Sequence, residues 1–158
     1  MDAPEFSAAQ VVKYDLQIAI DSACDRVWTA LVEQTNDWWP ADSRVLGESS
    51  VVTLTAQAGG GLIEQVDGAD SLLWGTVQMC QPKQHTLYLI LHTAHDWGGP
   101  MVSTMKIAVE ASGDDRCLLK VTDAIVGRVS EIGVQQLQQG WTDIFAGGLK
   151  KFVETNAS

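Results

Sequence analysis

The segment EIGVQQLQQGWTDIFAGGLKKFVE, residues 131–154, contains the longest helical pattern in the chain. It predicts a helix about 36 Å long, at roughly 1.5 Å per residue. Its apolar residues recur at spacings of three and four and form one stripe, which comprises Val134, Leu137, Trp141, Ile144, Phe145, Gly148 and Phe152. Ser130 is suited to cap the start of this helix. A long helix with one apolar face requires a second apolar surface to cover.

The surface that this helix covers is predicted to be a β-sheet. Residues 13–20 alternate, with Tyr14, Leu16, Ile18 and Ile20 on one side. Further strands are expected at 51–55, 62–66, 72–80, 87–91, 101–111 and 116–126, with turn signals such as Asp67-Gly68 between them. The pattern predicts an α+β protein in which a curved antiparallel sheet of six to seven strands wraps around the long C-terminal helix.

Two short helices are expected between the first strand and the second. Asp21 or Ser22 is suited to cap the first of them, and its apolar positions are Val27, Trp28, Leu31 and Val32. Pro40 ends the second, which holds Trp38 and Trp39. Glycines at 140, 147 and 148 suggest either a close approach of the last helix to the sheet or room beside it.

The length of 158 residues suits one domain, expected over residues 11–155 after a disordered tail at residues 1–10. The formal net charge of -10 argues against a nucleic-acid partner, because binding to phosphates requires basic patches. The same charge argues against anionic membrane surfaces, and no apolar run approaches the roughly 20 residues of a membrane helix.

The three cysteines, at positions 24, 80 and 117, are odd in number and widely spaced. This spacing suggests neither a disulfide framework nor a zinc site. The first ten residues also lack the pattern of a signal peptide. We therefore expect a cytoplasmic protein with reduced thiols.

Several motifs occur in an order that resembles a known superfamily. They are Ile20-x6-Val27-Trp28, Trp38-Trp39-Pro40, Gly60-Gly61, the Asp67-Gly68 turn, Trp74-Gly75-x-Val77 followed by Pro82, and Gly140-Trp141. Together they resemble the START-like superfamily, also called SRPBCC, helix-grip, birch-pollen-allergen or polyketide cyclase superfamily. The most similar branch is the one that resembles the activator of the heat-shock protein 90 ATPase. The resemblance covers residues 12–154.

The resemblance implies a cavity between the curved sheet and the last helix. Members bind lipids, polyketides, hormones or other apolar molecules, and some are cyclases or aromatases. The chain departs from the family at one position: members often end the last strand with Leu-Thr-His, where this chain has Val121-Thr122-Asp123. Any role that the family assigns to that histidine is therefore in doubt here.

Two polar residues are candidates for chemistry. Asp123 shares the apolar side of its strand, where burial would raise its pKa and suit it to general acid or base catalysis. Alternatively, Asp123 lies at the solvent-exposed end of the strand or caps a turn. His92 is placed to line a pocket mouth or to lie on a surface loop. His92, His95 and Asp96 invite a metal hypothesis, but residues three apart on a strand point to opposite faces, and no metal is expected.

The large apolar residues predict either a cavity lining or ordinary core. The candidates for contact with a ligand, polar and apolar, are Trp39, Trp74, Tyr88, His92, Met105, Asp123, Trp141 and Phe145. The first hypothesis is a binding module for a small apolar or aromatic molecule, without a cofactor. The second is a cyclase- or hydratase-type enzyme that uses Asp123 and His92 as acid and base. The third is a chaperone-associated protein, by analogy with the heat-shock protein 90 activator.

Overall fold

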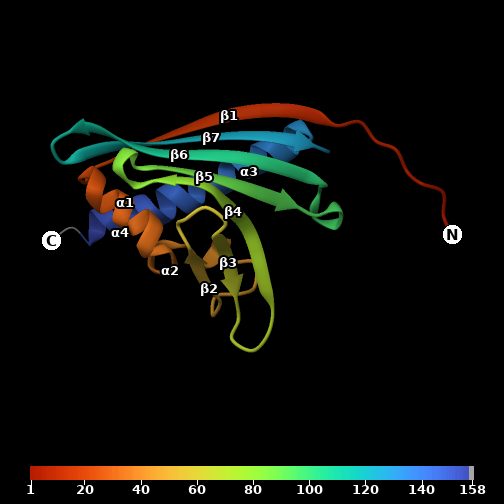
Figure 1. Cartoon of the computed structure of the whole chain (residues 1–158), viewed down its shortest axis with the longest axis horizontal. Helices are drawn as coiled ribbons and strands as arrows, with labels where there is room; N and C mark the ends of the chain where they lie inside the picture. Colours follow the sequence, from red (N-terminus) through yellow and green to blue (C-terminus); the bar gives the residue numbers. More distant parts are fainter. Residues whose placement is uncertain (157–158) are drawn as a thin grey trace.

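A computed structural model describes residues 1–156. Its centre is one antiparallel sheet of seven strands in the order β1-β7-β6-β5-β4-β3-β2. The strands are β1 (Gln10–Ile20), β2 (Val51–Leu54), β3 (Gly61–Gln65), β4 (Ser71–Gln81), β5 (Thr86–Thr93), β6 (Met101–Gly113) and β7 (Arg116–Gly127). The first and last strands are therefore neighbours, and the chain returns to its start before the final helix begins (Figure 1).

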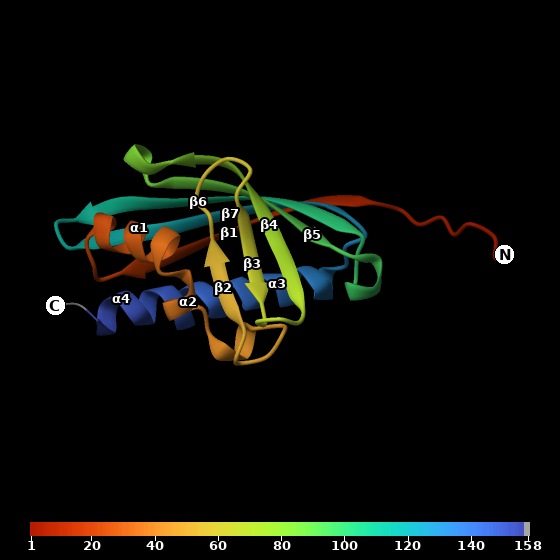
Figure 2. The ribbon, with the colours of Figure 1, turned by 60° about the horizontal axis from the view of Figure 1, so that its bottom comes forward.

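The helices lie on one side of this sheet. They are α1 (Cys24–Glu33), α2 (Thr35–Trp38), α3 (Glu131–Ile144) and α4 (Lys151–Thr155), and a π-helical segment, Phe145–Lys150, joins the last two. In Figure 2 the long helix formed by α3, the π-helical segment and α4 runs beneath the sheet, and β2, β3 and β4 curve down beside it. The predicted α+β fold, a curved sheet around a long C-terminal helix with two short helices after strand 1, is confirmed.

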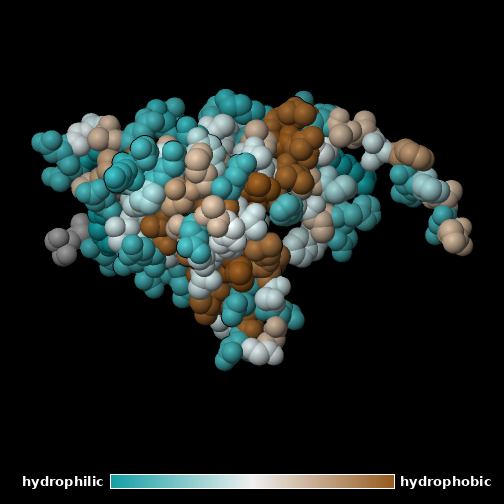
Figure 3. All heavy atoms as spheres, in the orientation of Figure 1, coloured by the Kyte–Doolittle hydropathy of each residue, from teal (hydrophilic) through white to brown (hydrophobic). Residues whose placement is uncertain are grey.

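Alternation sorts the residues of the neighbouring strands β1, β7, β6 and β5 between two faces. The inner face carries the core, including Leu89, Met105, Val121 and Leu16. The outer face carries an exposed row across four strands, because Val11 pairs with Val126, Val126 with Val102, and Val102 with His92. The three valines of this row are apolar and exposed, and Figure 3 shows brown spheres over β1, β7 and β6 at the upper right of the molecule.

The last helix is less regular than its sequence pattern predicts. Ser130 caps it as expected, since its Oγ accepts a hydrogen bond from the backbone N–H of Gly133 at 3.0 Å. The helix then widens into the π-helical segment, where Gly148 packs closely against α2. A Cβ atom at Gly148 would lie 2.5 Å from the Trp38 carbonyl oxygen. The close approach expected at this glycine is therefore made to α2 rather than to the sheet.

The cap expected for the first short helix is wrong. Helix α1 begins after Ala23, and no side chain caps it. Asp21 and Ser22 instead form the bend that follows β1. The strands extend the predicted ranges by one to three residues at most ends, because pairing with a neighbour continues past the last alternating apolar residue. Within residues 1–156, no helix has the length and apolar character needed to cross a membrane.

Candidate functional site

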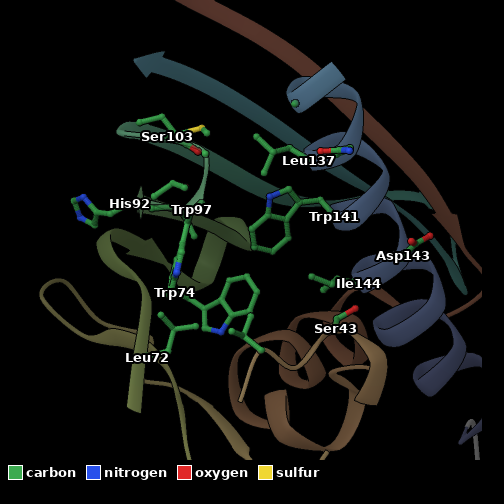
Figure 4. Close-up of a pocket in the computed structure, with 18 of the residues that line it drawn as sticks. Ser43, Leu72, Trp74, His92, Trp97, Ser103, Leu137, Trp141, Asp143 and Ile144 are labelled. Carbon is green, nitrogen blue, oxygen red and sulfur yellow. The ribbon is translucent and has the colours of Figure 1, made fainter. Parts of the chain in front are cut away.

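A cavity of about 730 Å³ lies between the inner face of the sheet and α3. Its sheet wall includes Trp74 on β4, Leu91 on β5 and Ser103 on β6, and its helix wall includes Leu137 and Trp141. In Figure 4 the indole of Trp141 extends from α3 into the space between helix and sheet, opposite Trp74. The cavity opens to solvent at a rim that includes the exposed side chains of Trp97 and Ile132.

Three tryptophans from three different segments meet at one end of the cavity. The ring centroids of Trp39 and Trp74 are 5.2 Å apart, those of Trp74 and Trp141 6.1 Å, and those of Trp39 and Trp141 6.3 Å. All three pairs meet edge to face, which is a favoured aromatic geometry. Phe145 stacks on the far side of Trp141 at 5.7 Å. The aromatic wall is therefore supported from behind.

Glu64 fixes the orientation of Trp74. It is fully buried on β3, and its Oε2 accepts a hydrogen bond from Trp74 Nε1 at 3.0 Å. It also accepts hydrogen bonds from the backbone N–H groups of Val45 and Leu46 and from Ser50 Oγ. Burial raises the pKa of the Glu64 carboxyl, but these four hydrogen bonds outweigh burial and leave the pKa below its usual value. Glu64 is thus a buried, ionised carboxylate that anchors one wall of the cavity.

Arg44 holds the loop that connects α2 to β2. Its guanidinium donates hydrogen bonds to the side chain and the backbone carbonyl of Asn36, and to the carbonyls of Trp39 and Ser50. These bonds fix the backbone on either side of the Trp39 ring. The cation is consequently committed to the loop rather than to the cavity.

Asp123 lies on the inner face of the sheet, near the cavity but not in its lining. It is fully buried on β7, and its Oδ2 accepts a hydrogen bond from Tyr14 Oη at 2.7 Å. Burial raises the pKa of Asp123, and the hydroxyls of Tyr14 and Ser103 offset that rise only in part. Ser103 lies close enough to lower the pKa of Asp123. Within residues 1–156, no group hydrogen-bonds to Asp123 Oδ1. Ser103 lines the cavity, whereas Asp123 is not among the lining residues.

The structure brings together only part of the predicted set of site residues. Trp74 and Trp141 line the cavity directly, and His92 lies at its border. Trp39, Met105, Asp123 and Phe145 are buried outside the lining. Tyr88 is on the outer face, where the ammonium of Lys106 lies 5.7 Å from its ring centroid. The inward position expected for Asp123 is correct, and the alternative of a solvent-exposed position at the strand end is wrong.

His92 and Asp123 face opposite sides of the sheet. His92 belongs to the outer row with Val102 and Val126, while Asp123 is directly opposite the inward-facing Met105. In Figure 4 the imidazole of His92 points away from Trp141 and the helix. An acid–base pair made of these two residues is therefore not assembled by this fold.

The sequence pattern did not single out Glu64 and Ser103, and it placed Tyr14 and Leu137 only on the apolar sides of a strand and a helix. Glu64 carried a usable signal, because it shares the inner side of its strand with Leu62, as Asp123 does with Val121. Ser103 carried none, since small polar residues are common in strands. Leu137 belongs to the helix stripe, but the stripe does not distinguish cavity residues from core residues. Among residues 1–156, no cluster of three or more histidine, cysteine or acidic side chains is arranged to hold a metal ion.

Comparison with solved structures shows which fold this is. A protein from Rhizobium leguminosarum described as uncharacterized matches with a TM-score of 0.68 and 16% identity, over 94% of this chain and 98% of that one. The allergen Ara h 8.0201 matches with a TM-score of 0.65 and 12% identity, over 93% and 100%. Norcoclaurine synthase from Thalictrum flavum, solved in complex with dopamine and hydroxybenzaldehyde, matches with a TM-score of 0.60 and 16% identity, over 96% and 90%.

These neighbours confirm, at the level of the fold, the resemblance to the START-like, birch-pollen-allergen superfamily. No family model matches the sequence, and no curated protein does. Identities of 12–16% establish a shared architecture and nothing more.

Proposed function

We propose that this protein binds a small apolar or aromatic molecule in the cavity between the sheet and α3. The observation that carries the proposal is the aromatic wall: Trp74 and Trp141 face a space of about 730 Å³ without filling it. Ligand cavities in proteins generally measure about 300–1,000 Å³ and are mostly apolar with a few polar groups. The space is thus large enough for a molecule of two or three fused rings.

The anchoring of the wall supports the same proposal. Glu64 fixes Trp74, and Trp39 and Phe145 pack against Trp141, so that the wall keeps its shape when the cavity is empty. A wall that is already ordered loses little side-chain entropy on binding, and this favours affinity. The norcoclaurine synthase neighbour, which has this fold and was solved in complex with two small aromatic molecules, supports the proposal.

Titration with N-phenylnaphthylamine, an uncharged probe that fluoresces in apolar surroundings, tests the proposal. Leu137 is a half-buried cavity residue, so that Leu137→Trp places an indole in the space where the probe would bind. We expect this variant to weaken probe binding by at least about tenfold, because the added ring occupies the apolar volume. The matched control, Val126→Trp, adds the same ring on the outer face and should leave probe affinity unchanged.

Equal affinity in the wild-type protein and Leu137→Trp would place the probe elsewhere and refute the proposed site. Thermal unfolding of both variants checks that each is folded.

Acid–base catalysis on the bound molecule is a second candidate. One observation favours it: Asp123 is buried, has a raised pKa, and lies near the cavity residue Ser103. In this version Ser103 contacts the ligand and exchanges a proton with Asp123, and His92 has no part. Unchanged turnover in Ser103→Ala, measured on any substrate that a screen identifies, would exclude this route. The chaperone-associated role stays a prediction from resemblance alone.

A further inference from the structure

The lining of the cavity includes few ionisable side chains, and none of them is a strong base. Among the residues that line it there is no lysine and no arginine. The ionisable residues at its border are Asp42, Asp143 and His92. The imidazole of His92 points away from the cavity, and Asp143 accepts a hydrogen bond from Gln139 on the exposed side of α3. A molecule in the cavity therefore meets no cationic side chain.

The basic residues nearest in sequence do not supply the missing charge. Arg44 lies between the lining residues Ser43 and Val45, but its guanidinium is occupied by Asn36 and by backbone carbonyls. Arg128 precedes the lining residue Ser130, but it is exposed and does not line the cavity. The guanidinium of Arg44 is therefore engaged by the loop, and that of Arg128 is not part of the lining.

A buried carboxylate lies behind the lining instead. It is Glu64, which is ionised and accepts a hydrogen bond from Trp74 Nε1. The chain as a whole has a formal net charge of -10. In surroundings of low polarity the charge of Glu64 is poorly screened, so that an anion near Trp74 is repelled.

We propose that the cavity selects uncharged aromatic molecules and rejects their carboxylate, sulfonate or phosphate derivatives. This inference rests on the proposed function and specifies the class of ligand. An anion that enters the cavity gives up its hydration and gains no cation in return, which is costly. An uncharged ring loses only unfavourable hydration of its apolar surface. Backbone and hydroxyl groups, such as that of Ser103, suffice for a neutral polar substituent.

Two probes with one skeleton test this selectivity. N-phenylnaphthylamine is uncharged, and anilinonaphthalene sulfonate is the same molecule with one sulfonate added. We expect the sulfonate to bind the wild-type protein at least about tenfold more weakly than the uncharged probe, because its desolvation is not compensated. The titrations are done at low ionic strength and repeated at high salt, where any repulsion from distant charges weakens.

A charge-restoring variant shows that the effect arises in the cavity. Thr93 is a half-buried lining residue at the end of β5. Thr93→Lys should tighten binding of the sulfonate by roughly tenfold relative to the uncharged probe. Thr93→Gln, which adds similar length without charge, should change both affinities alike and leave their ratio at the wild-type value.

The outcomes separate the two proposals. If both probes bind the wild-type protein equally well, and Leu137→Trp weakens both, the cavity binds ligands but the charge selectivity is wrong. If neither probe binds, the proposed function fails and the selectivity fails with it. Weak sulfonate binding that Thr93→Lys does not improve would also overturn the inference, since rejection would then have a cause other than charge.

Discussion

Asp123 shows how a single residue can oppose the stability of the fold. Its carboxyl is fully buried and has one hydrogen-bond partner, Tyr14, while Oδ1 has none within residues 1–156. Because burial raises its pKa, the folded protein holds this proton more tightly than the unfolded chain does. Stability from this group is therefore fully present at low pH. It is lost as the pH rises from the unfolded pKa of about 3.9 through the folded pKa.

Asp123→Asn should remove the loss of stability that ionisation of Asp123 causes as the pH rises. The amide oxygen can still accept the hydrogen bond from Tyr14, and no charge has to be buried. At neutral pH we expect the variant to be more stable than the wild-type protein by about 1–2 kcal/mol. Near pH 4 the two should converge. Urea unfolding at a series of pH values measures this, and a difference that does not vary with pH would show that ionisation of Asp123 is not the cause.

Glu64 has the opposite pH dependence. Four hydrogen bonds outweigh burial and lower the pKa of Glu64 in the folded protein. Its contribution to the free energy of unfolding is therefore present above the unfolded pKa of about 4.3. That contribution is lost as the pH falls through the lower pKa of the folded state. Glu64→Gln loses the charge and turns an amide NH2 toward N–H donors. We expect a destabilisation of about 2–4 kcal/mol at neutral pH and a shift in Trp74 fluorescence.

Denaturant unfolding measures the stability of Glu64→Gln, and its tryptophan fluorescence reports on the environment of Trp74. Glu33→Gln, an exposed position at the end of α1, is the matched control. A loss in Glu64→Gln no larger than in this control would mean that the carboxylate does not anchor the wall.

At the scale of elements, the last helix depends on one glycine for its fit. A Cβ atom at Gly148 would lie 2.5 Å from the Trp38 carbonyl oxygen and 2.9 Å from Pro40 Cδ, whereas one at Gly147 would meet nothing within 4 Å. Gly148→Ala should therefore destabilise the protein by roughly 1–3 kcal/mol. Gly147→Ala should stabilise it by about 0.5–1 kcal/mol, because alanine favours a helix.

Thermal unfolding of the two alanine variants provides the comparison. Equal effects at both positions would contradict the close packing of the π-helical segment against α2.

The elements themselves could largely be predicted from the sequence. Alternation in residues 13–20 and 116–126, and the apolar stripe of residues 131–154, are strong signals because sheet and helix have different periods. Helix α1 was harder to delimit, since Asp21 and Ser22 are good caps by composition but lie in the bend after β1. The apolar stripe gives no signal for the π-helical segment, in which Gly148 packs closely against α2.

The candidate site was less predictable than the fold. Trp74, Trp141 and the inward position of Asp123 follow from alternation and from the helix stripe. The outward position of His92 depends on the register that links it to Val102, and the strand ends are where register is least clear in a sequence. Which large side chains line a cavity and which fill the core is set by the distance between helix and sheet. Met105 and Phe145 are consequently core, although their sequence positions resemble those of lining residues.

At the scale of the whole molecule, the sheet wraps around a helix that it does not fully contact. The core is continuous between the sheet and helices α1 and α4, while the cavity lies beside α3. The six tryptophans report on this division, because Trp74 and Trp141 line the cavity and Trp28 is stacked on His85 away from it.

The most direct measurement is a spectrum of the indole N–H groups of the six tryptophans, recorded by NMR while N-phenylnaphthylamine is added. If the probe binds in the cavity, the signals of Trp74 and Trp141 shift and saturate together, and the signal of Trp28 stays in place. A titration in which Trp74 and Trp141 do not respond, or in which Trp28 responds as strongly as they do, would contradict a ligand cavity between the sheet and α3.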